Sequence, residues 1–285
     1  PSENRAKGEY EWNHYRVTAN DGVIKLAVNG KEVSGVSKCT PRKGYLALEA
    51  EGSECRFKNI KIKELPSTNP KPEEICDVDV GFVSLFTGLD LTGWKAGDEH
   101  KKHWLMNDGV LHYDGRCKAK DPNLWTEKSY GDFEMICDWR FPGKPIKMKR
   151  PIILPTGETS KEEVEVLDAG DSGIYLRGNA KNQINIWCWP VASGEVWGYR
   201  TDPKSSPEVK AGVTPKVNAD NKLGQWNRFF IRMKGDRLTV KLNGKLVIDN
   251  AHLPGIAPTG PIALQHHGDP IQFRNVFIRE LKADE

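Results

Sequence analysis

The segment IALQHHG, residues 262–268, places a proton-transferring side chain on a strand of alternating apolar and polar residues. Side chains of a β-strand alternate between its two faces, so Ile262 and Leu264 belong to a core, and Gln265 and His267 belong to the opposite face. Histidine exchanges protons near neutral pH, as a general acid or base must. His267 is therefore a candidate acid/base or ligand-binding residue, with Gln265 as a substrate contact. A hydrogen-bonded surface histidine fits the pattern equally well.

A second group of reactive side chains lies in the glycine-flanked segment GEVWGYR, residues 194–200. Loops at the rim of a β domain often carry functional residues. Glu195 is a candidate acid/base, Arg200 could stabilise negative charge, and Tyr199 could contact a substrate. The alternative for Glu195 is an ordinary solvated carboxylate of a loop.

Two strand patterns add a candidate binding face. In SGIYLRG, the alternation directs Tyr175 and Arg177 away from the core, and in NQINIWCWP it does the same for Asn185, Trp187 and Trp189. Flat apolar rings beside an amide suit the C–H faces and hydroxyl groups of a sugar. Arg177 could clamp a hydroxyl or stabilise an enolate. The alternatives are tryptophans buried under a loop and an arginine in a salt bridge.

Two aspartates have less specific patterns. Asp138 lies off the apolar parity of its strand, so it could bind a sugar hydroxyl or orient Arg177. Asp171 precedes Ser-Gly and could equally be a turn residue. The charged segment at residues 142–168 resembles an inserted hairpin, which predicts a lid or a surface arm.

These residues must be positioned by an antiparallel β-sandwich. IKLAVNGKEV and LTVKLNGKLV each combine two alternating strands with an Asn-Gly pair, the favoured type I′ hairpin turn. Further strands are expected at residues 132–141, 172–178, 182–190 and 227–234. Long helical periodicity is absent, so the chain is expected to be all-β.

The chain also contains an internal repeat. Residues 11–33 match residues 225–247 at a constant shift of 214, and residues 45–65 match 261–281 at a shift of 216. We therefore expect residues 1–65 to be the C-terminal half of a first, truncated sandwich from a longer precursor. A half-sandwich needs a partner surface, supplied by a missing half-domain, domain two or another chain. Residues 66–79 would be a linker, and residues 80–285 a complete sandwich carrying the site.

Composition excludes several function classes. The net charge is +3 on 285 residues, and no basic run with interleaved aromatics occurs, so a nucleic-acid partner is not expected. No apolar window of about 18 residues predicts a membrane span. The cysteine spacing matches no zinc motif. Cys39 and Cys55 flank one strand of the first copy and are absent together from the second, so they could form a disulfide or be two free thiols.

Six blocks of the sequence resemble the 3-keto-disaccharide hydrolase family. They are FTGLDLTGW, WLMNDGVLHY, YGDFEMICDWRF, DSGIYLRG, QWNRFFIRMKGDRLTVKLNGKLVID and GPIALQHHGDPIQFRNVFIREL. The resemblance covers residues 80–285, with the back half of a second copy at residues 8–65. It implies a concanavalin A-like jelly-roll sandwich, a secreted or periplasmic location, and cleavage of glycosides oxidised to a ketone at C3. Residues 182–200 depart from the Tyr-Glu-Val-Gln-type segment common in this family.

The implied substrate defines roles for the candidate residues. A ketone at C3 acidifies the C2 hydrogen, so a base can remove it and the C1 substituent can leave by elimination, followed by hydration. We expect His267 or Glu195 as acid/base, Arg177 and Arg200 as electrostatic stabilisers, and Trp187 and Trp189 as a sugar platform. No cofactor is identified, and a divalent cation is possible. The alternative is a non-catalytic, lectin-like carbohydrate-binding module.

Overall fold

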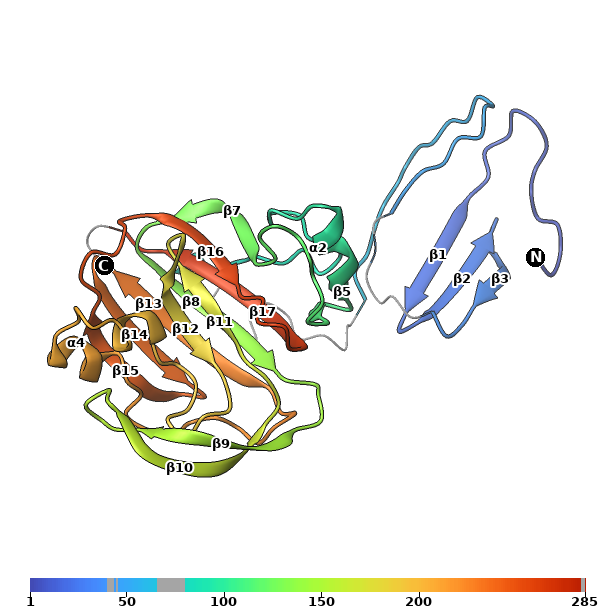
Figure 1. The fold of residues 1–285 in the computed structure, drawn as a ribbon. Coiled ribbons are helices and arrows are strands. Elements are labelled where there is room, and N and C mark those ends of the chain that lie inside the picture. The colour runs from blue at the N-terminus through green and yellow to red at the C-terminus, as the bar shows by residue number, and fades with distance from the viewer. Residues whose placement is uncertain (40–43, 45, 66–79, 283–284) are drawn as a thin grey trace. The chain divides into compact units, whose positions relative to one another are not determined.

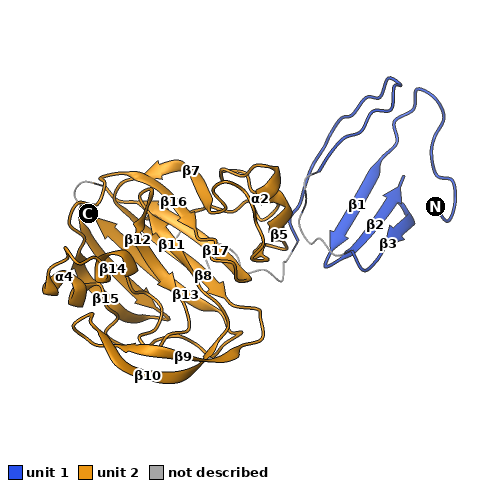
Figure 2. Cartoon of the chain, in the orientation of Figure 1, with its two compact units in different colours: residues 1–71 blue, residues 72–285 orange. Residues whose placement is uncertain are grey.

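The chain divides into two compact units, residues 1–71 and residues 72–285 (Figure 2). The computed structural model describes residues 1–39, 44, 46–65, 80–282 and 285. The expected linker, residues 66–79, lies outside the described residues.

The larger unit contains two antiparallel sheets and a separate hairpin (Figure 1). One sheet has the strand order β15-β14-β13-β8-β17-β6-β5, with β4 pairing with β17, and the other has the order β12-β11-β16-β7. The strands of the eight-stranded sheet are β4 (Val83–Ser84), β5 (Trp104–Asn107), β6 (Val110–Tyr113), β8 (Phe133–Arg140), β13 (Asn227–Lys234), β14 (Arg237–Leu242), β15 (Lys245–His252) and β17 (Ile271–Glu280). Those of the four-stranded sheet are β7 (Leu124–Tyr130), β11 (Ser172–Leu176), β12 (Asn179–Ile186) and β16 (Gly260–Leu264). The hairpin consists of β9 (Ile146–Ile153) and β10 (Thr159–Asp168), and short helices are α2 (Asp98–His103), α3 (Trp197–Arg200) and α4 (Pro207–Gly212).

One face of each sheet forms a shared core. Phe229 and Ile231 alternate along β13 with partly exposed residues, and both are fully buried. Ile174, Ile184 and Leu264 are also fully buried, on three strands of the four-stranded sheet, and all five side chains belong to one apolar cluster. Burying each such side chain contributes roughly 1.5–3 kcal/mol. The two sheets therefore pack as a jelly-roll β-sandwich, and the expected all-β antiparallel fold is confirmed.

The smaller unit contains a three-stranded sheet, β1 (Tyr15–Asn20), β2 (Val23–Val28) and β3 (Lys31–Val36). These strands correspond to β13, β14 and β15 of the larger unit. The first residues of β2 and β3 lie 214 residues before those of β14 and β15, and the first residue of β1 lies 212 residues before that of β13. The turn between β2 and β3 has positive φ at Asn29 and Gly30 (48° and 89°), and the turn between β14 and β15 has 51° and 80° at Asn243 and Gly244. Both are therefore the type I′ turns that Asn-Gly favours.

The side-chain contacts of the turn are also the same in both units. Asn29 Nδ2 donates to Asn13 Oδ1 at 2.8 Å, and Asn243 Nδ2 donates to Asn227 Oδ1 at 2.8 Å. Three further hydrogen bonds of the first pair recur at the same shift. These contacts support the repeat, while the origin of residues 1–65 as a truncated tandem copy stays a prediction.

The two units differ in what covers their apolar residues. Tyr15 and Phe57 are 63% and 49% exposed, whereas their counterparts Phe229 and Phe273 are fully buried. Residues 46–65, expected to contain two strands, form no hydrogen-bonded strand. Their counterparts β16 and β17 pair with β6, β7, β8 and β11, and the described part of the smaller unit contains no equivalent of those strands. In the structure, Cys39 and Cys55 are free thiols rather than a disulfide.

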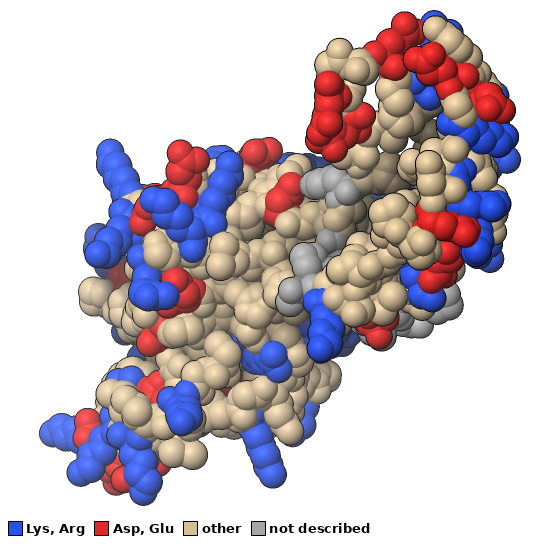
Figure 3. Space-filling model, turned by 90° about the vertical axis from the view of Figure 1, so that its right-hand side faces the viewer, with Lys and Arg blue, Asp and Glu red and all other residues tan. Residues whose placement is uncertain are grey.

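Charged residues of both signs cover the surface. On the face shown in Figure 3, Lys and Arg are interspersed with Asp and Glu rather than gathered into one basic patch. No helix formed by the described residues is long and apolar enough to cross a membrane.

The difference in burial predicts different costs for one substitution made in both units. Phe273→Ala should lower the free energy of unfolding of the larger unit by about 3–5 kcal/mol, because it opens a cavity in a closed core. Phe57→Ala should change the unfolding free energy by less than about 1 kcal/mol, because the ring is half exposed. Urea unfolding followed by tryptophan fluorescence measures both. Equal losses would show that the face carrying Phe57 is covered.

Candidate functional site

The outer face of the four-stranded sheet carries a group of polar side chains. Tyr175 on β11 pairs with Gln183 on β12 and Ala263 on β16, and all three point away from the core. Gln183 Nε2 donates to Gln265 Oε1 at 2.7 Å, so the two amides span β11. Gly173 makes this possible, because a Cβ there would lie 2.6 Å from Gln183 Nε2. Tyr175, Gln183 and Gln265 are each less than a tenth exposed.

Glu195 extends this face beyond β12. Ile184 and Val196 form an antiparallel bridge, and the amide of Asn185 donates to the carbonyl of Glu195 at 2.9 Å. Residues opposite each other in such a pair point to the same side, so Glu195 and Asn185 lie side by side on the outer face. The structure thus places Asn185, Gln265 and Tyr175 on the outer face of one sheet, with Glu195 of the adjoining loop beside Asn185.

Glu195 is fully buried beside Arg200 of α3. Arg200 Nε donates to Glu195 Oε1 at 2.5 Å, and Oε2 has no hydrogen-bond partner among the described residues. Burial raises the pKa of Glu195 to about 7, because the opposing effect of Arg200 is smaller than the loss of hydration and Asp171 adds repulsion. A carboxyl group that titrates near neutrality can exchange protons under physiological conditions.

A second carboxyl group with a raised pKa lies at the ends of β11 and β16. Burial raises the pKa of Asp171 to about 6; His267 opposes this shift, and Asp269 and Asp168 reinforce it. The amide of Asp171 donates to Asp269 Oδ2 at 2.9 Å, and His267 Nδ1 lies 3.7 Å from the same oxygen. Asp269 thus holds Asp171 and His267 together. The side chain of His267 is half exposed.

The hairpin β9–β10 contacts this group at two places. Arg200 Nη1 donates to Thr159 Oγ1 at 3.2 Å near the hairpin turn. Arg150 pairs with Asp168 at 2.6 Å across the hairpin, and its guanidinium carbon lies 5.4 Å from the ring centre of Trp189. Figure 1 shows the hairpin as an arm along one edge of the sandwich. The segment at residues 142–168 is therefore an arm that supports the site.

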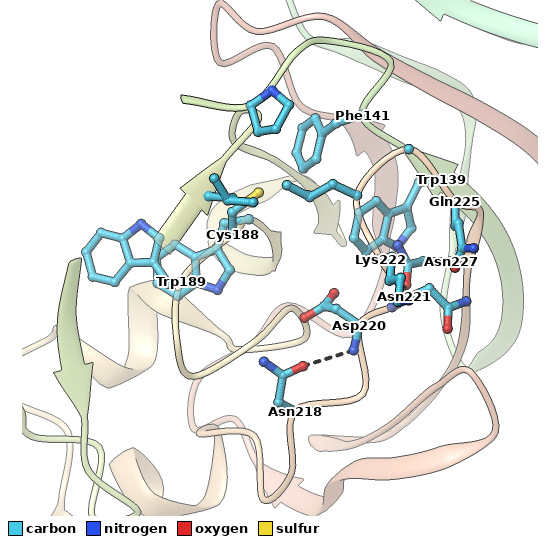
Figure 4. A pocket seen from close by; sticks show the side chains of 15 residues that line it. Trp139, Phe141, Cys188, Trp189, Asn218, Asp220, Asn221, Lys222, Gln225 and Asn227 are labelled. Carbon is cyan, nitrogen blue, oxygen red and sulfur yellow. Dashed lines mark hydrogen bonds between the residues drawn. The ribbon is translucent and has the colours of Figure 1, made fainter. Parts of the chain in front are cut away.

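Trp187 and Trp189 form a stacked pair rather than an in-line platform. Their ring centres are 4.4 Å apart and the rings are nearly parallel, at 7°. β12 ends at Ile186, so strand alternation no longer sets their directions. Trp187 is almost fully buried, and its Nε1 donates to Ala192 O at 2.7 Å. A cavity of about 570 Å³ adjoins the pair (Figure 4).

Arg177 does not join this group. It occupies the turn between β11 and β12 with φ of 48°, and Gly178 follows with 76°, so Arg-Gly is a second type of sequence that makes a tight hairpin here. Its guanidinium donates to Gly131 O, Gly235 O and Ala257 O and pairs with Asp132 at 2.8 Å. The outward direction predicted for Arg177 from the alternation of SGIYLRG is wrong, because β11 ends one residue earlier, at Leu176. Arg177 is instead buried, and its hydrogen bonds connect three loops.

Asp138 and Tyr199 also lie elsewhere. Asp138 lies off the core parity as expected, but β8 belongs to the eight-stranded sheet, where the carboxylate pairs with Arg228 at 2.6 Å instead of Arg177. Tyr199 lies on α3 and belongs to the apolar core, with its hydroxyl group donating to Pro254 O at 3.3 Å. Neither contacts the outer face of the four-stranded sheet in any interaction recorded for the described residues.

Arg150, Asp269 and Gln183 are not among the residues that the sequence patterns above indicate, and the pattern at Asp171 is equally that of a turn residue. Asp171 nevertheless shares the parity of Tyr175, because it lies two positions before Gly173. Asp269 follows the end of β16, and Arg150 lies on the inserted hairpin, so no strand pattern of the sandwich indicates where either side chain lies. Within the described residues, no group of three or more His, Cys, Asp or Glu side chains is arranged to hold a metal ion.

Comparison with known proteins gives one family match. The model of the 3-keto-alpha-glucoside-1,2-lyase-like domain matches residues 1–63 and 81–279. No curated protein matches the chain. A crystal structure of a "putative glycosyl hydrolase" from Parabacteroides distasonis ATCC 8503 is similar at 21% identity and a TM-score of 0.50, covering 74% of this chain and 97% of that one. A second protein of the same description and organism has 24% identity and a TM-score of 0.49, covering 70% and 84%. The former similarity supports the fold.

The raised pKa of Glu195 predicts a characteristic pH dependence of stability. The folded state holds this proton more tightly than the unfolded state, in which the pKa is near 4.5. Stability from Glu195 is therefore present below pH 4.5 and is lost as pH rises to about 7, by roughly 3 kcal/mol. Glu195→Gln should remove this loss, so the difference between variant and parent grows with pH.

Urea unfolding at several pH values between 4 and 8 measures this difference. Glu195→Gln leaves Arg200 unpaired, which gives an offset that does not vary with pH in this range. Glu163→Gln, an exposed carboxyl on β10, is the control and should follow the parent. Parallel curves for Glu195→Gln and the parent would contradict the raised pKa.

Proposed function

Because the chain belongs to the 3-keto-alpha-glucoside-1,2-lyase-like domain family, we propose that it cleaves glycosides that carry a ketone at C3. The family match supports a carbohydrate-acting, glycoside hydrolase-like function. The observation that carries the finer proposal is the pair of interacting carboxyl groups with pKa values of about 6 and about 7, Asp171 and Glu195, of which Asp171 also interacts with His267. An elimination at a carbon next to a ketone requires proton transfer at near-neutral pH.

Asp171 is the proposed base. Its carboxylate accepts no hydrogen bond from the described residues and is partly accessible, whereas Glu195 is fully buried and held by Arg200. The carboxylate takes the proton from C2, and the C–H electrons form an enolate whose charge lies on the oxygen at C3. The enolate then re-forms the ketone while a double bond forms between C1 and C2 and the bond from C1 to the leaving oxygen breaks.

His267 is the proposed acid for the leaving oxygen. Its half-exposed ring lies at the open end of the group and faces Asp269. After departure of the leaving group, water adds across the C1–C2 double bond, with hydroxide to C1 and a proton to C2. The sum of the two steps is hydrolysis of the glycoside, with no external oxidant or reductant.

Positive charge near Asp171 supports stabilisation of the enolate. The charge of Arg150 lowers the pKa of Asp171, although less than His267 does. Arg200 contributes a second guanidinium, which Glu195 orients through the bond at 2.5 Å. Glu195 is thus proposed as a positioning residue. Tyr175, Gln183, Asn185 and Gln265 are proposed to contact sugar hydroxyl groups.

The alternative is a lectin-like carbohydrate-binding module without catalysis. It is favoured by one observation: Glu195 is fully buried, so that carboxyl group is out of reach of a substrate in this conformation. The proposal also retains the secreted or periplasmic location that the family resemblance implies. Residues 1–65 are proposed to bury their apolar face against a polypeptide segment with the alternation of β8.

The enzyme proposal predicts deuterium incorporation at C2. When a 3-keto-disaccharide is cleaved in D₂O, the 3-keto-hexose released should carry deuterium at C2, because that hydrogen is removed and later replaced from solvent. An ordinary glycosidase would leave it in place. NMR of early time points measures this, with 3-keto-hexose incubated without protein as the exchange control and unoxidised disaccharide as the substrate control.

Variants assign the roles. Asp171→Asn and His267→Ala should each lower kcat by about 10²–10⁴-fold, and kcat/KM of the parent should rise with pH through about 6 as Asp171 ionises. Glu163→Gln should have no effect. Binding of the oxidised disaccharide without turnover would favour the binding module. Two variants together can refute the assignment: the double variant His267→Ala/Glu195→Gln and the single variant Asp171→Asn. Full turnover by both would show that none of these three residues is needed.

A further inference from the structure

The cavity beside the tryptophan pair has walls from several separate segments, among them Pro145 and Leu167 at the base of the β9–β10 hairpin (Figure 4). Trp139 and Phe141 come from the end of β8, Trp187 to Trp189 from the loop after β12, and residues 218–227 from the loop before β13. Its volume of about 570 Å³ lies within the range of roughly 300–1,000 Å³ for small-molecule sites. Apart from Trp187 and Trp189, no residue that lines this cavity has been given a role in the proposed reaction.

Two of the residues that line the cavity carry a polar atom that is buried and has no hydrogen-bond partner among the described residues. Trp139 is 2% exposed, and its Nε1 makes no hydrogen bond to any described residue. Asp220 Oδ1 is also unpartnered, although Oδ2 accepts from the amide of Ser193 at 2.9 Å. In Figure 4 the indole and the carboxylate approach the cavity from different segments.

The unpaired indole of Trp139 differs from the other buried tryptophans of the larger unit. The other three donate through Nε1: Trp94 to Leu85 O, Trp104 to Pro122 O and Trp187 to Ala192 O. A buried donor without an acceptor destabilises a protein, so such groups in native proteins call for a functional reason. The same applies to Asp220, and burial raises the pKa of that carboxyl group.

The chemistry of the walls selects the ligand. A donor and an acceptor together match hydroxyl groups, which can accept from the indole and donate to the carboxylate. An anion would be repelled by Asp220, and a purely apolar molecule would leave both atoms unpaired. The aromatic rings of Phe141 and Trp189 suit the C–H faces of a sugar.

We propose that this cavity is a binding subsite for a neutral, unoxidised sugar ring, with hydroxyl groups bonded to Trp139 Nε1 and Asp220 Oδ1. Resting on the proposed function, this ring is the leaving sugar of the oxidised disaccharide. The cavity is connected to the reacting end through Cys188, whose Sγ accepts from the amide of Ala169 at 3.4 Å, two residues before Asp171. A second connection runs from Asp220 through Ser193 to Glu195, two residues further along.

Calorimetric titration with maltose and cellobiose tests the subsite without requiring turnover. We expect the parent to bind at least one of these disaccharides, and Trp139→Phe to weaken binding by about three- to tenfold, the effect of losing one hydrogen bond. Asp220→Asn should weaken binding similarly, because its amide oxygen would keep the Ser193 contact and turn a donor toward the ligand. Cyclohexanol and gluconate are the apolar and anionic probes and should bind more weakly.

Trp94→Phe is the matched control. It removes an indole that does have an acceptor, at 2.8 Å, so it should lower the melting temperature and leave sugar binding unchanged. Trp139→Phe should lower the melting temperature less, because no hydrogen bond within the protein is lost. Equal sugar affinity of Trp139→Phe and the parent, tighter binding of cyclohexanol, or no binding of either disaccharide would overturn the subsite.

The outcome is separable from the proposed reaction. If Asp171→Asn binds the sugar and adding Trp139→Phe to that variant weakens the binding, the subsite is supported even if no 3-keto-disaccharide is cleaved. Cleavage that proceeds with unchanged KM in Trp139→Phe would support the reaction and overturn the subsite.

Discussion

The structure depends on the burial of one face of the four-stranded sheet. Ile174, Ile184 and Leu264 pack against the larger sheet and are fully buried, so a slip of one residue in any of these strands would turn core residues outward. The register set by this packing places Tyr175, Gln183 and Gln265 together on the other face. The polar group on the outer face is therefore a consequence of the core, and the same alternation that stabilises the fold positions the side chains that we propose contact a sugar.

Burial also sets the electrostatics of the site. Asp171 and Glu195 are shielded from water by neighbouring segments, and in both cases loss of hydration is the largest cause of the raised pKa. Nearby arginines lower these values without cancelling the effect of burial. Because Asp171 also raises the pKa of Glu195, ionisation of one carboxyl group disfavours ionisation of the other. The hairpin β9–β10 contributes to this environment through Arg150 and Thr159, so an element outside the sandwich tunes groups attached to it.

The two units show how much of a sheet's local structure is independent of its core. The Asn-Gly turn and its hydrogen bonds are the same at Asn29 and Asn243, because they involve only residues of the turn and the neighbouring segment. The burial of Phe273 and the exposure of Phe57 differ because burial requires a second layer. Local turn chemistry and tertiary packing are thus separable in one chain, and only the unit with both layers has a closed core.

The sequence by itself determined the all-β class, the hairpin turns and the face on which Tyr175, Asn185 and Gln265 lie, because alternation and turn propensity are local properties. It did not determine which sheet a strand joins, so the sequence left Asp138 either to a sugar hydroxyl or to Arg177, whereas β8 lies in the other sheet and Asp138 pairs with Arg228. Nor did the sequence indicate where strand alternation stops. In the structure it stops before Arg177, which lies in a turn, and before Trp187, which stacks on Trp189. Only the tertiary structure brought Asp171, Asp269 and Arg150 together, because each comes from a strand end or an inserted hairpin whose position depends on packing between distant segments.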